Sequence, residues 1–430
     1  MGDAVDLVRD NVSHVLSRFQ TSPMHFYLGF SGGVDSTSLL DAVCSYLKQH
    51  TQHQLSLIHI NHGLHDDADA WEAHCAGVAR QYRLPLSTHQ VLIQAKHDGI
   101  ENACRKARWA VFTSILSKKN HCLLLAHHAN DQVETFFLRL MRGAGLSGLS
   151  SIREDCHISG IRVVRPLLSI DKTAILTYAS VLSLPYISDS TNFDSVYDRN
   201  YIRNDIIPSL QARWPSAVSQ AIRSIGHIQA DWDYLLNIAS IHLDELITIR
   251  FGLPCIDQNR FNMLSQADRY LCLRAYILRK GWYLPSSKQM AMLVNQLESS
   301  RKGSTCTFQT NQFSLFVYAS FVYLLPKGFF TRVPDSVKFD LKPDLYLPFH
   351  CPNPCRAVAD WSALIGQSKN ASCELIFGDS VIDLLGAKRY KKILQSRGVP
   401  LRIRRCYPFL ILDHRCIPLS FVAEDSVPGA

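Results

Sequence analysis

A glycine- and serine-rich segment near the N-terminus has the composition of an anion-binding loop. It reads Ser31-Gly32-Gly33-Val34-Asp35-Ser36 and follows a short apolar run at residues 25–30. The glycines allow a sharp turn that presents backbone N–H groups, and the serine hydroxyls add donors. A helix that begins here would point its positive end at the same place. The spacing and the lysine of a Walker loop are absent. A serine helix cap is the alternative, but the pattern favours a phosphate-binding loop.

Two arginines further along the chain could hold a phosphate group. Arg105 and Arg108 are three residues apart in a helical stretch, so both can face one site. The fixed fork of donors in arginine suits phosphate and developing phosphoryl charge. The alternative is a solvated basic helix face, and Glu101 could simply pair with Arg105.

Histidine and carboxylate side chains gather where another strand is followed by a helix. His127, Asp131 and Glu134 lie in this segment. One interpretation is that they contact a substrate. The other is helix capping, because Asp131 and Glu134 have capping-box spacing, although that box normally begins with Ser or Thr.

Three histidines spaced by three residues raise the question of a zinc site. They are His59, His62 and His65. No cysteine or carboxylate accompanies them in a recognised ligand spacing, which argues against zinc. The segment instead follows the second strand, where an adenine could lie along the backbone.

These groups need a scaffold that brings distant segments together, and the apolar pattern predicts one. Short apolar runs alternate with longer amphipathic stretches, which predicts right-handed βαβ crossovers and an α/β, Rossmann-like, doubly wound parallel sheet. Such sheets bind ligands at the carboxyl ends of their strands. The expected strands are 25–30, 55–60, 89–93, 121–126 and 162–168, and the expected helices are 35–49, 67–82, 100–118 and 131–142.

The rest of the chain predicts two further domains after a catalytic domain at residues 1–205. Residues 206–330 are mostly helical and end in alternating segments, which predict a small antiparallel sheet. Prolines between 334 and 354 mark a loop-rich stretch, and residues 331–430 predict a small α+β domain. The antiparallel strands are expected at 305–309, 313–319 and 321–325.

A basic segment in the last domain is a candidate surface for a polyanion. Eight of the eighteen residues from 388 to 405 are basic and none is acidic. Tyr390, Ile393 and Leu394 form an apolar helical stripe that Gly398 and Pro400 would end. We expect this helix to dock through the stripe and to expose its cations, with supporting strands at 399–403 and 409–412. A solvated cationic surface is the alternative.

Composition fits a globular chain with a polyanionic partner. The 430 residues carry 45 Lys plus Arg against 37 Asp plus Glu, and this modest excess favours a polyanionic partner. The apolar runs are too short for a membrane span, and the N-terminus lacks a secretory pattern. The thirteen cysteines form no C-x-x-C pair, which argues against an iron–sulfur site and predicts a reducing, cytoplasmic location.

The glycine-rich loop resembles the pyrophosphatase loop of the N-type ATP pyrophosphatases, the PP-loop superfamily. Its members cleave ATP between the α and β phosphates and transfer AMP to a carbonyl-type oxygen. The resemblance implies that ATP lies against Ser31, Gly32, Gly33, Val34, Asp35, Ser36 and His59, and that Asp35 helps to hold Mg²⁺.

Four further segments resemble one family, the tRNA(Ile)-lysidine synthetases, and residues 386–400 resemble its terminal domain. That family uses ATP to adenylate the C2 oxygen of the first anticodon cytidine of tRNA(Ile) with a CAU anticodon, and the ε-amine of L-lysine then displaces AMP. The resemblance implies an ATP-dependent ligase and leaves a homodimer open. The segments are His59–Leu64, Glu101–Arg108, Ala126–Thr135 and Asp189–Pro208.

The resemblance also assigns roles to individual residues. Catalysis would involve Asp35, Arg105, Arg108 and His127. The carboxylates of Asp131 and Glu134 would bind the lysine ammonium. Transfer RNA would contact Arg199, Arg203, Lys388, Arg389, Lys391 and Lys392.

Three other functions stay open at this point. A tRNA thiolation enzyme of the same superfamily would need reactive or cluster-binding cysteines. A small-molecule amidotransferase, such as an asparagine or GMP synthetase, would carry a glutaminase domain, often with a cysteine after Met1, where Gly2 stands here. A tRNA-binding protein without catalysis would not need Asp35 in an intact loop.

Overall fold

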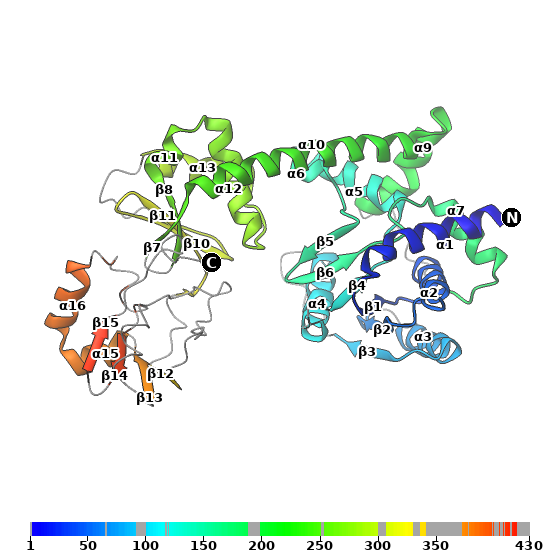
Figure 1. Ribbon diagram of the computed structural model, residues 1–430. Coiled ribbons are helices and arrows are strands. Elements are labelled where there is room, and N and C mark those ends of the chain that lie inside the picture. The colour runs from blue at the N-terminus through cyan, green and yellow to red at the C-terminus, as the bar shows by residue number, and fades with distance from the viewer. Residues whose placement is uncertain are drawn as a thin grey trace. The chain divides into compact units, whose positions relative to one another are not determined.

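The computed structural model describes residues 2–64, 67–91, 100–116, 118, 120–187, 198–250, 253–299, 307–329, 336–340, 372–376, 378–397 and 399, together with 404, 407, 409–412 and 415–418. The chain divides into two compact units, Met1–Leu235 and Leu236–Ala430 (Figure 1). No helix among the described residues has the length and apolar character that crossing a membrane requires.

The first unit is built on a six-stranded sheet in the order β3-β2-β1-β4-β6-β5. All neighbouring strands are parallel except the edge strand β5, which forms an antiparallel hairpin with β6. The predicted doubly wound parallel sheet is therefore confirmed. The strands are β1 (His25–Gly29), β2 (Gln54–Asn61), β3 (Leu86–Gln90), β4 (His121–Leu124), β5 (Asp155–Ile158) and β6 (Ile161–Val164).

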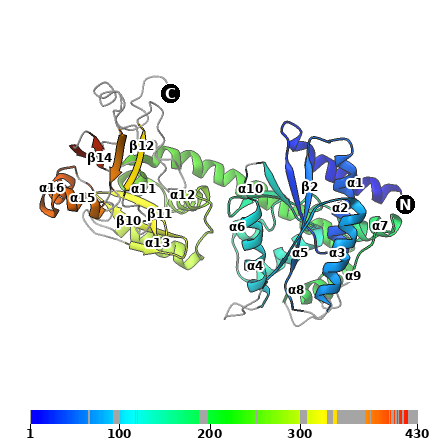
Figure 2. The same ribbon diagram turned by 90° about the horizontal axis from the view of Figure 1, so that it is seen from below.

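Helices cover both faces of this sheet because alternate strand residues are apolar on each face. Phe26 and Leu28 of β1 pack with apolar residues of four helices on one face. On the other face, Ile58 of β2 packs with Phe112 and Leu116 at the C-terminal end of α4. Helices α2 and α3 thus lie on one side and α4 on the other (Figure 2). The first face carries α1 (Gly2–Leu16), α2 (Val34–Leu47), α3 (Ala68–Tyr82) and α7 (Lys172–Val181), and the second carries α4 (Ile100–Ile115).

The remaining elements of this unit are helical: one short 3-10 helix directly follows α1, and the others follow the carboxyl end of β4 or the end of α7. A small apolar cluster joins Val133 of α5 to Ile202, Ile207 and Val218. These elements are the 3-10 helix η1 (Ser17–Phe19), α5 (Ala129–Met141), α6 (Leu146–Leu149), α8 (Asp198–Tyr201), the π-helix η3 (Ile202–Ile206), α9 (Ile207–Arg213) and α10 (Ala217–Leu246), which continues into the second unit.

The second unit contains two antiparallel sheets. The first has the order β7-β8-β11-β10-β9 and packs against helices, and the second has the order β12-β13-β14-β15. Its helices are α11 (Gln258–Met263), α12 (Gln266–Arg279), α13 (Ser287–Ser299), α15 (Gly378–Leu385) and α16 (Ala387–Ser396). Its strands are β7 (Ile247–Arg250), β8 (Leu253–Asp257), β9 (Thr307–Gln309), β10 (Phe313–Tyr318), β11 (Phe321–Pro326), β12 (Ser336–Asp340), β13 (Ser372–Ile376), β14 (Phe409–Leu412) and β15 (Arg415–Pro418).

Several boundaries differ from the sequence-based expectations. Strand β3 begins three residues before the predicted 89–93, and the hairpins β5–β6 and β7–β8 were not predicted. Val399 lies outside any strand, and residues 400–403 fall outside the described ones. The chain divides into its two units between Leu235 and Leu236. One core joins Phe316 and Tyr323 to Tyr390 and Phe409, so residues from both predicted C-terminal domains belong to one unit. The three-domain division stays a prediction.

Candidate active site

The expected site residues gather where the direction of strand order reverses. Strands β1 and β4 are neighbours in the sheet, although three crossovers separate them in the chain. The glycine-rich loop leaves the carboxyl end of β1, and His127 and His128 follow the carboxyl end of β4. Ligands of open α/β sheets bind at such a switch point. The fold therefore brings together segments that lie about a hundred residues apart.

Gly32 is required by the local packing of the loop. Its φ of +79° lies in the left-handed region, which favours glycine. A Cβ at this position would meet Sγ of Cys75 at 2.9 Å and Cδ1 of Ile187 at 3.2 Å. The carbonyl of Gly32 also accepts a hydrogen bond from the N–H of Ile187 at 3.0 Å. The loop is thus braced from α3 and from the segment after α7.

Among the described residues, no neighbour requires a glycine at position 33. It precedes α2 with a φ of −74°, and a Cβ there would meet only the Ser31 hydroxyl, at 3.5 Å. The hydroxyls of Ser31 and Ser36 lie 3.2 Å apart beside it. The space that a Cβ would occupy lies at the N-terminal end of α2, where a bound anion would approach the backbone. This open position fits a phosphate group.

Three histidine nitrogens have no hydrogen-bond partner among the described residues, and two of these histidines, His74 and His128, lie beside Gly32 or Asp35 of the loop. They are buried and make no hydrogen bond within the described part of the chain. Cδ2 of His74 lies 3.3 Å from the position of a Cβ on Gly32, and His128 lies near Asp35. Buried polar atoms are normally hydrogen-bonded, so these atoms point to a polar ligand. The three are Nδ1 of His62, Nε2 of His74 and Nδ1 of His128.

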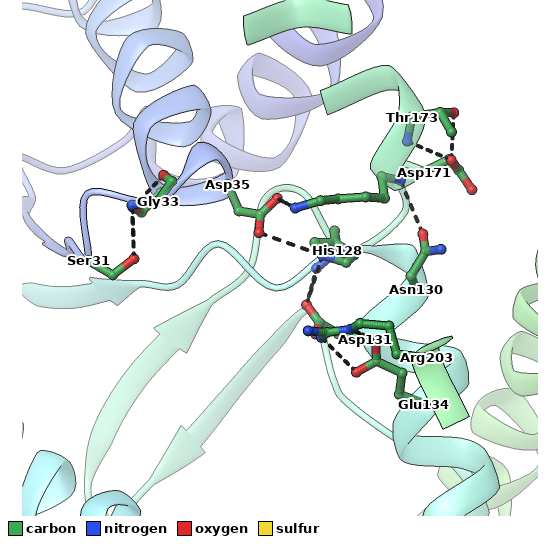
Figure 3. A network of polar contacts seen from close by, with 12 residues as sticks. Ser31, Gly33, Asp35, His128, Asn130, Asp131, Glu134, Asp171, Thr173 and Arg203 are labelled. Carbon is green, nitrogen blue, oxygen red and sulfur yellow. Dashed lines mark hydrogen bonds and ion pairs between the residues drawn. The ribbon is translucent and has the colours of Figure 1, made fainter. Parts of the chain in front are cut away.

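Asp35, in the first turn of α2, holds a lysine that the sequence did not single out. Nζ of Lys172 lies 2.6 Å from Oδ1 of Asp35. Nε2 of His128 lies 3.7 Å from Oδ2 of Asp35 (Figure 3). The Asp35 side chain is 30% exposed. Lys172 begins α7, and its backbone N–H donates to Oδ1 of Asn130 at 3.1 Å. These bonds tie the first turns of α2, α5 and α7 to one another.

His127 is held as a neutral ring. Nε of Arg165 donates to its Nδ1 at 3.2 Å. Burial lowers the pKa of His127 to about 3, and the cations Arg165, Arg199 and Arg108 act in the same direction against the carboxylate of Asp131. Among the described residues, Nε2 of this ring makes no hydrogen bond. It can therefore donate to a ligand.

Asp131 contributes to the N-terminal capping of α5, although it is not the N-cap residue. Helix α5 begins one residue after His128, and Oδ2 of Asp131 accepts from the His128 backbone N–H at 3.0 Å. Asp131 is thus the third helical residue rather than the cap itself. Burial would raise its pKa, but His128 and Arg199 together with this hydrogen bond lower the pKa to about 2.

Glu134 lies at the centre of a buried ion-pair cluster. Its side chain has no exposed surface, and it accepts from Nε of Arg199 at 2.7 Å and from Nε of Arg203 at 2.6 Å. Arg199 also pairs with Asp131 at 2.8 Å. The carboxylates expected to bind lysine are therefore paired with the arginines expected to bind tRNA. The arginine side chains are 29% and 35% exposed, so they line the solvent side of the cluster.

The two predicted phosphate-binding arginines lie on α4 and are exposed. Arg108 lies near two site histidines, because it contributes, after burial, to the lowered pKa of His62 and of His127. Arg105 lies near Arg139 instead. His59 is buried on β2, and its Nδ1 donates to the carbonyl of Phe30 at 2.9 Å, so this ring nitrogen has a structural role. His65 is outside the described residues.

The basic face of α16 has the predicted form. Tyr390 and Leu394 are buried in the core of the second unit. The four cations between and around them are exposed, as expected for a helix that docks through one stripe. We call them the basic face: Lys388, Arg389, Lys391 and Lys392.

The described cysteines are free, and several are buried. Burial raises the pKa of the thiols of Cys44, Cys75, Cys122 and Cys255 to about 12. Such thiols stay protonated and are poor nucleophiles. No group of three or more His, Cys, Asp or Glu residues placed to hold a metal occurs in the part of the chain that the structure describes.

Fold and loop together define a PP-loop protein, and residues 7–210 match the PP-loop domain family. Curated relatives extend the match to nearly the whole chain. The tRNA(Ile)-lysidine synthase of Photorhabdus laumondii is 32% identical over 93% of this chain and 90% of its own length. That of Serratia proteamaculans is 30% identical over 96% and 95%. The chain belongs to the tRNA(Ile)-lysidine synthase family.

One solved structure, the U34-tRNA thiolase NcsA from Methanococcus maripaludis with its [4Fe-4S] cluster, aligns with 54% of this chain and 81% of its own. Its identity is 18% and its TM-score 0.47. No functional conclusion follows at this level of similarity.

Proposed function

We propose that this protein forms lysidine on tRNA(Ile) with a CAU anticodon, using ATP and L-lysine. The observation that carries the proposal is one edge of the sheet, where the phosphate loop with Asp35 faces the His127–Glu134 segment. Membership of the lysidine synthase family supports the same reaction. In the first step the cytidine C2 oxygen attacks the α phosphorus of ATP, and pyrophosphate leaves. In the second step the lysine amine forms a C2–N bond as the C2–O bond to AMP breaks.

The loop residues would hold the nucleotide phosphates. The open position at Gly33 and the hydroxyls of Ser31 and Ser36 support this role, because they place donors at the start of α2. Asp35 and phosphate oxygens would hold Mg²⁺, which neutralises charge on the departing pyrophosphate and commonly takes one or two carboxylates plus phosphates. Lys172 now neutralises Asp35 and would be free to neutralise phosphate charge once Asp35 has another cation.

The carboxylates of Asp131 and Glu134 would receive the lysine ammonium. Both carboxylates are now paired with Arg199 or Arg203, so the ammonium would have to replace one of these arginine contacts. Both arginines are partly exposed, so an incoming ammonium can approach from the same side. A charge-assisted contact of this kind stabilises the bound state by about 1.5–3 kcal/mol. Arg199 and Arg203 would then contact the tRNA backbone or the activated base.

The thiolation alternative has less support. A sulfur-transfer reaction needs a reactive thiolate, whereas burial keeps the pKa of the four thiols named above near 12. The basic face of α16 supports an RNA partner without distinguishing between the two reactions. Because ATP and tRNA are cytoplasmic, we propose that location as well. A homodimer stays a prediction that sedimentation of the full chain would test.

The decisive experiment incubates the full chain with tRNA(Ile) transcript, ATP, Mg²⁺ and radiolabelled lysine, followed by nucleoside analysis. We expect label in a modified cytidine, with AMP released in equal amount. A transcript with a different first anticodon base is the matched control and should take up no label. Incorporation of sulfur from a donor, or ATP cleavage without lysine in the RNA, would overturn the proposal.

A further inference from the structure

A buried arginine that the sequence did not single out faces the histidine of the site. Arg165 directly follows β6 and is 5% exposed. Besides the bond to Nδ1 of His127, its Nη1 donates to the carbonyl of Arg153 at 2.6 Å and to Sγ of Cys156 at 3.3 Å. All three acceptors are neutral. The arginine therefore orients its neighbours rather than balancing a carboxylate.

The bond to His127 fixes where the imidazole carries its proton. A guanidinium has only donors and stays charged at any ordinary pH. Nδ1 of His127 must therefore offer a lone pair, and a neutral ring with this lone pair has its hydrogen on Nε2. With the hydrogen on Nδ1, two N–H groups would face each other at 3.2 Å.

The surroundings of the ring favour the same state. Asp131 faces it from α5, whereas Arg165 after β6, Arg199 on α8 and Arg108 on α4 bring positive charge from three other directions. Burial and these cations hold the pKa of His127 far below its usual range. A neutral ring is therefore expected throughout the physiological pH range.

Arg165 is itself held in place by the β5–β6 hairpin. Its backbone N–H donates to the carbonyl of Glu154 at 2.8 Å. Across the hairpin, Asp155 and Arg162 form an ion pair with an Nη2–Oδ2 distance of 2.6 Å. The edge hairpin thus gives the guanidinium a fixed position beside β4.

We propose that Arg165 is a positioning residue that fixes His127 as a hydrogen-bond donor at Nε2. The acceptor would be an anionic or carbonyl-type oxygen of the nucleotide or the activated base. Only this identity of the acceptor rests on the proposed function. A ring with its hydrogen on Nε2 and its Nδ1 occupied cannot accept the proton of the attacking amine. Another group must therefore take that proton.

Two-bond ¹H–¹⁵N spectra of the full chain with ¹⁵N-labelled histidine test the assignment directly. The variant His127→Gln identifies the ring signals of His127. We expect a neutral Nε2–H ring from pH 5 to pH 8 in the parent. A parent ring with its hydrogen on Nδ1, or one that titrates within this range, would overturn the proposal whatever the variants do.

The variant Arg165→Leu removes the donor, and Arg165→Met, which also lacks an N–H donor, is used if it fails to fold. We expect the ring to populate Nδ1–H and its pKa to rise, while burial, the largest cause of the lowering, still holds the pKa below its ordinary value. Arg139→Leu is the matched control, because Arg139 is also partly buried and donates to the carbonyls of Gly148 and Ser151 at 2.7 and 3.0 Å. It should leave the His127 signals unchanged. Unchanged signals in the Arg165 variants would also refute the proposal.

Turnover gives a second readout that a merely structural role would not move. Loss of an oriented donor should lower kcat of Arg165→Leu by about tenfold to a hundredfold at pH 8. Below the pH at which the spectra show the variant ring becoming cationic, Nε2 carries a hydrogen again, so the deficit should shrink. A deficit independent of pH would contradict the proposal. The spectra are recorded on the free enzyme, so they test the position of the His127 proton even if the protein does not form lysidine.

Discussion

Replacing Glu134 by glutamine should affect stability and lysine recognition together. The substitution keeps the shape of the side chain but removes the charge that two arginines share at 2.6–2.7 Å. Breaking a buried ion pair costs about 3–5 kcal/mol. Here the arginine side chains are 29% and 35% exposed, and solvent screening reduces the cost to about 2–3 kcal/mol. For a unit of this size the melting temperature should fall by about 4–12 °C.

Calorimetry and substrate kinetics of the full chain would measure both effects. We expect KM for lysine to rise about tenfold to a hundredfold, because one charge-assisted contact is lost, and KM for ATP to stay within about twofold. Asp233→Asn is the matched control for stability. Asp233 pairs with Arg153 at 2.7 Å, but its side chain is 59% exposed, so the effect should stay below about 1 kcal/mol. A lower melting temperature with an unchanged KM for lysine would show that Glu134 only holds the arginines.

Three further changes test other parts of the site. Asp35→Asn should lower lysine incorporation by about 10²–10³-fold with little change in melting temperature, and near-normal turnover would exclude a metal role. Because the pKa of Asp131 is depressed to about 2, its contribution to stability is present above about pH 4 and is lost as the pH falls toward 2. Urea unfolding should show that Asp131→Asn lacks this loss, which amounts to about 2 kcal/mol. Alanine at all four positions of the basic face should flatten the salt dependence of tRNA binding by about 0.7–0.9 log units per lost contact, and an identical slope in filter binding would show that this face does not touch RNA.

The sequence predicts the parallel sheet well because each crossover is a local pattern. Apolar runs and amphipathic stretches of suitable length repeat from residue 25 onward, and the observed strands follow them within a few residues. The two hairpins that the sequence did not predict, β5–β6 and β7–β8, lack such a pattern. Strands β5 and β7 are four residues long and pair with a neighbour at an edge of their sheets, so neither shows a clear periodicity.

The site was only partly predictable, because its ion pairs join residues far apart in the chain. The loop and the His127–Glu134 segment carry recognisable motifs of their own. Lys172 carries none, since it follows the helix cap Asp171 and resembles a solvated first-turn residue. Arg165 similarly follows a strand end. Charge alone does not specify which partner a side chain meets, so the pairing of Arg199 with Glu134 also required the fold.

The bracing of the phosphate loop has a consequence for how the chain acquires activity during synthesis. The carbonyl of Gly32 bonds to the N–H of Ile187, and Asp35 pairs with Lys172, 137 residues away in the chain. A ribosome-bound chain that ends before these residues has the loop sequence but lacks the contacts that shape it. The loop cannot form these long-range contacts before Lys172 and Ile187 have been synthesised. We therefore expect the phosphate loop to reach its folded geometry only after Ile187 has left the exit tunnel.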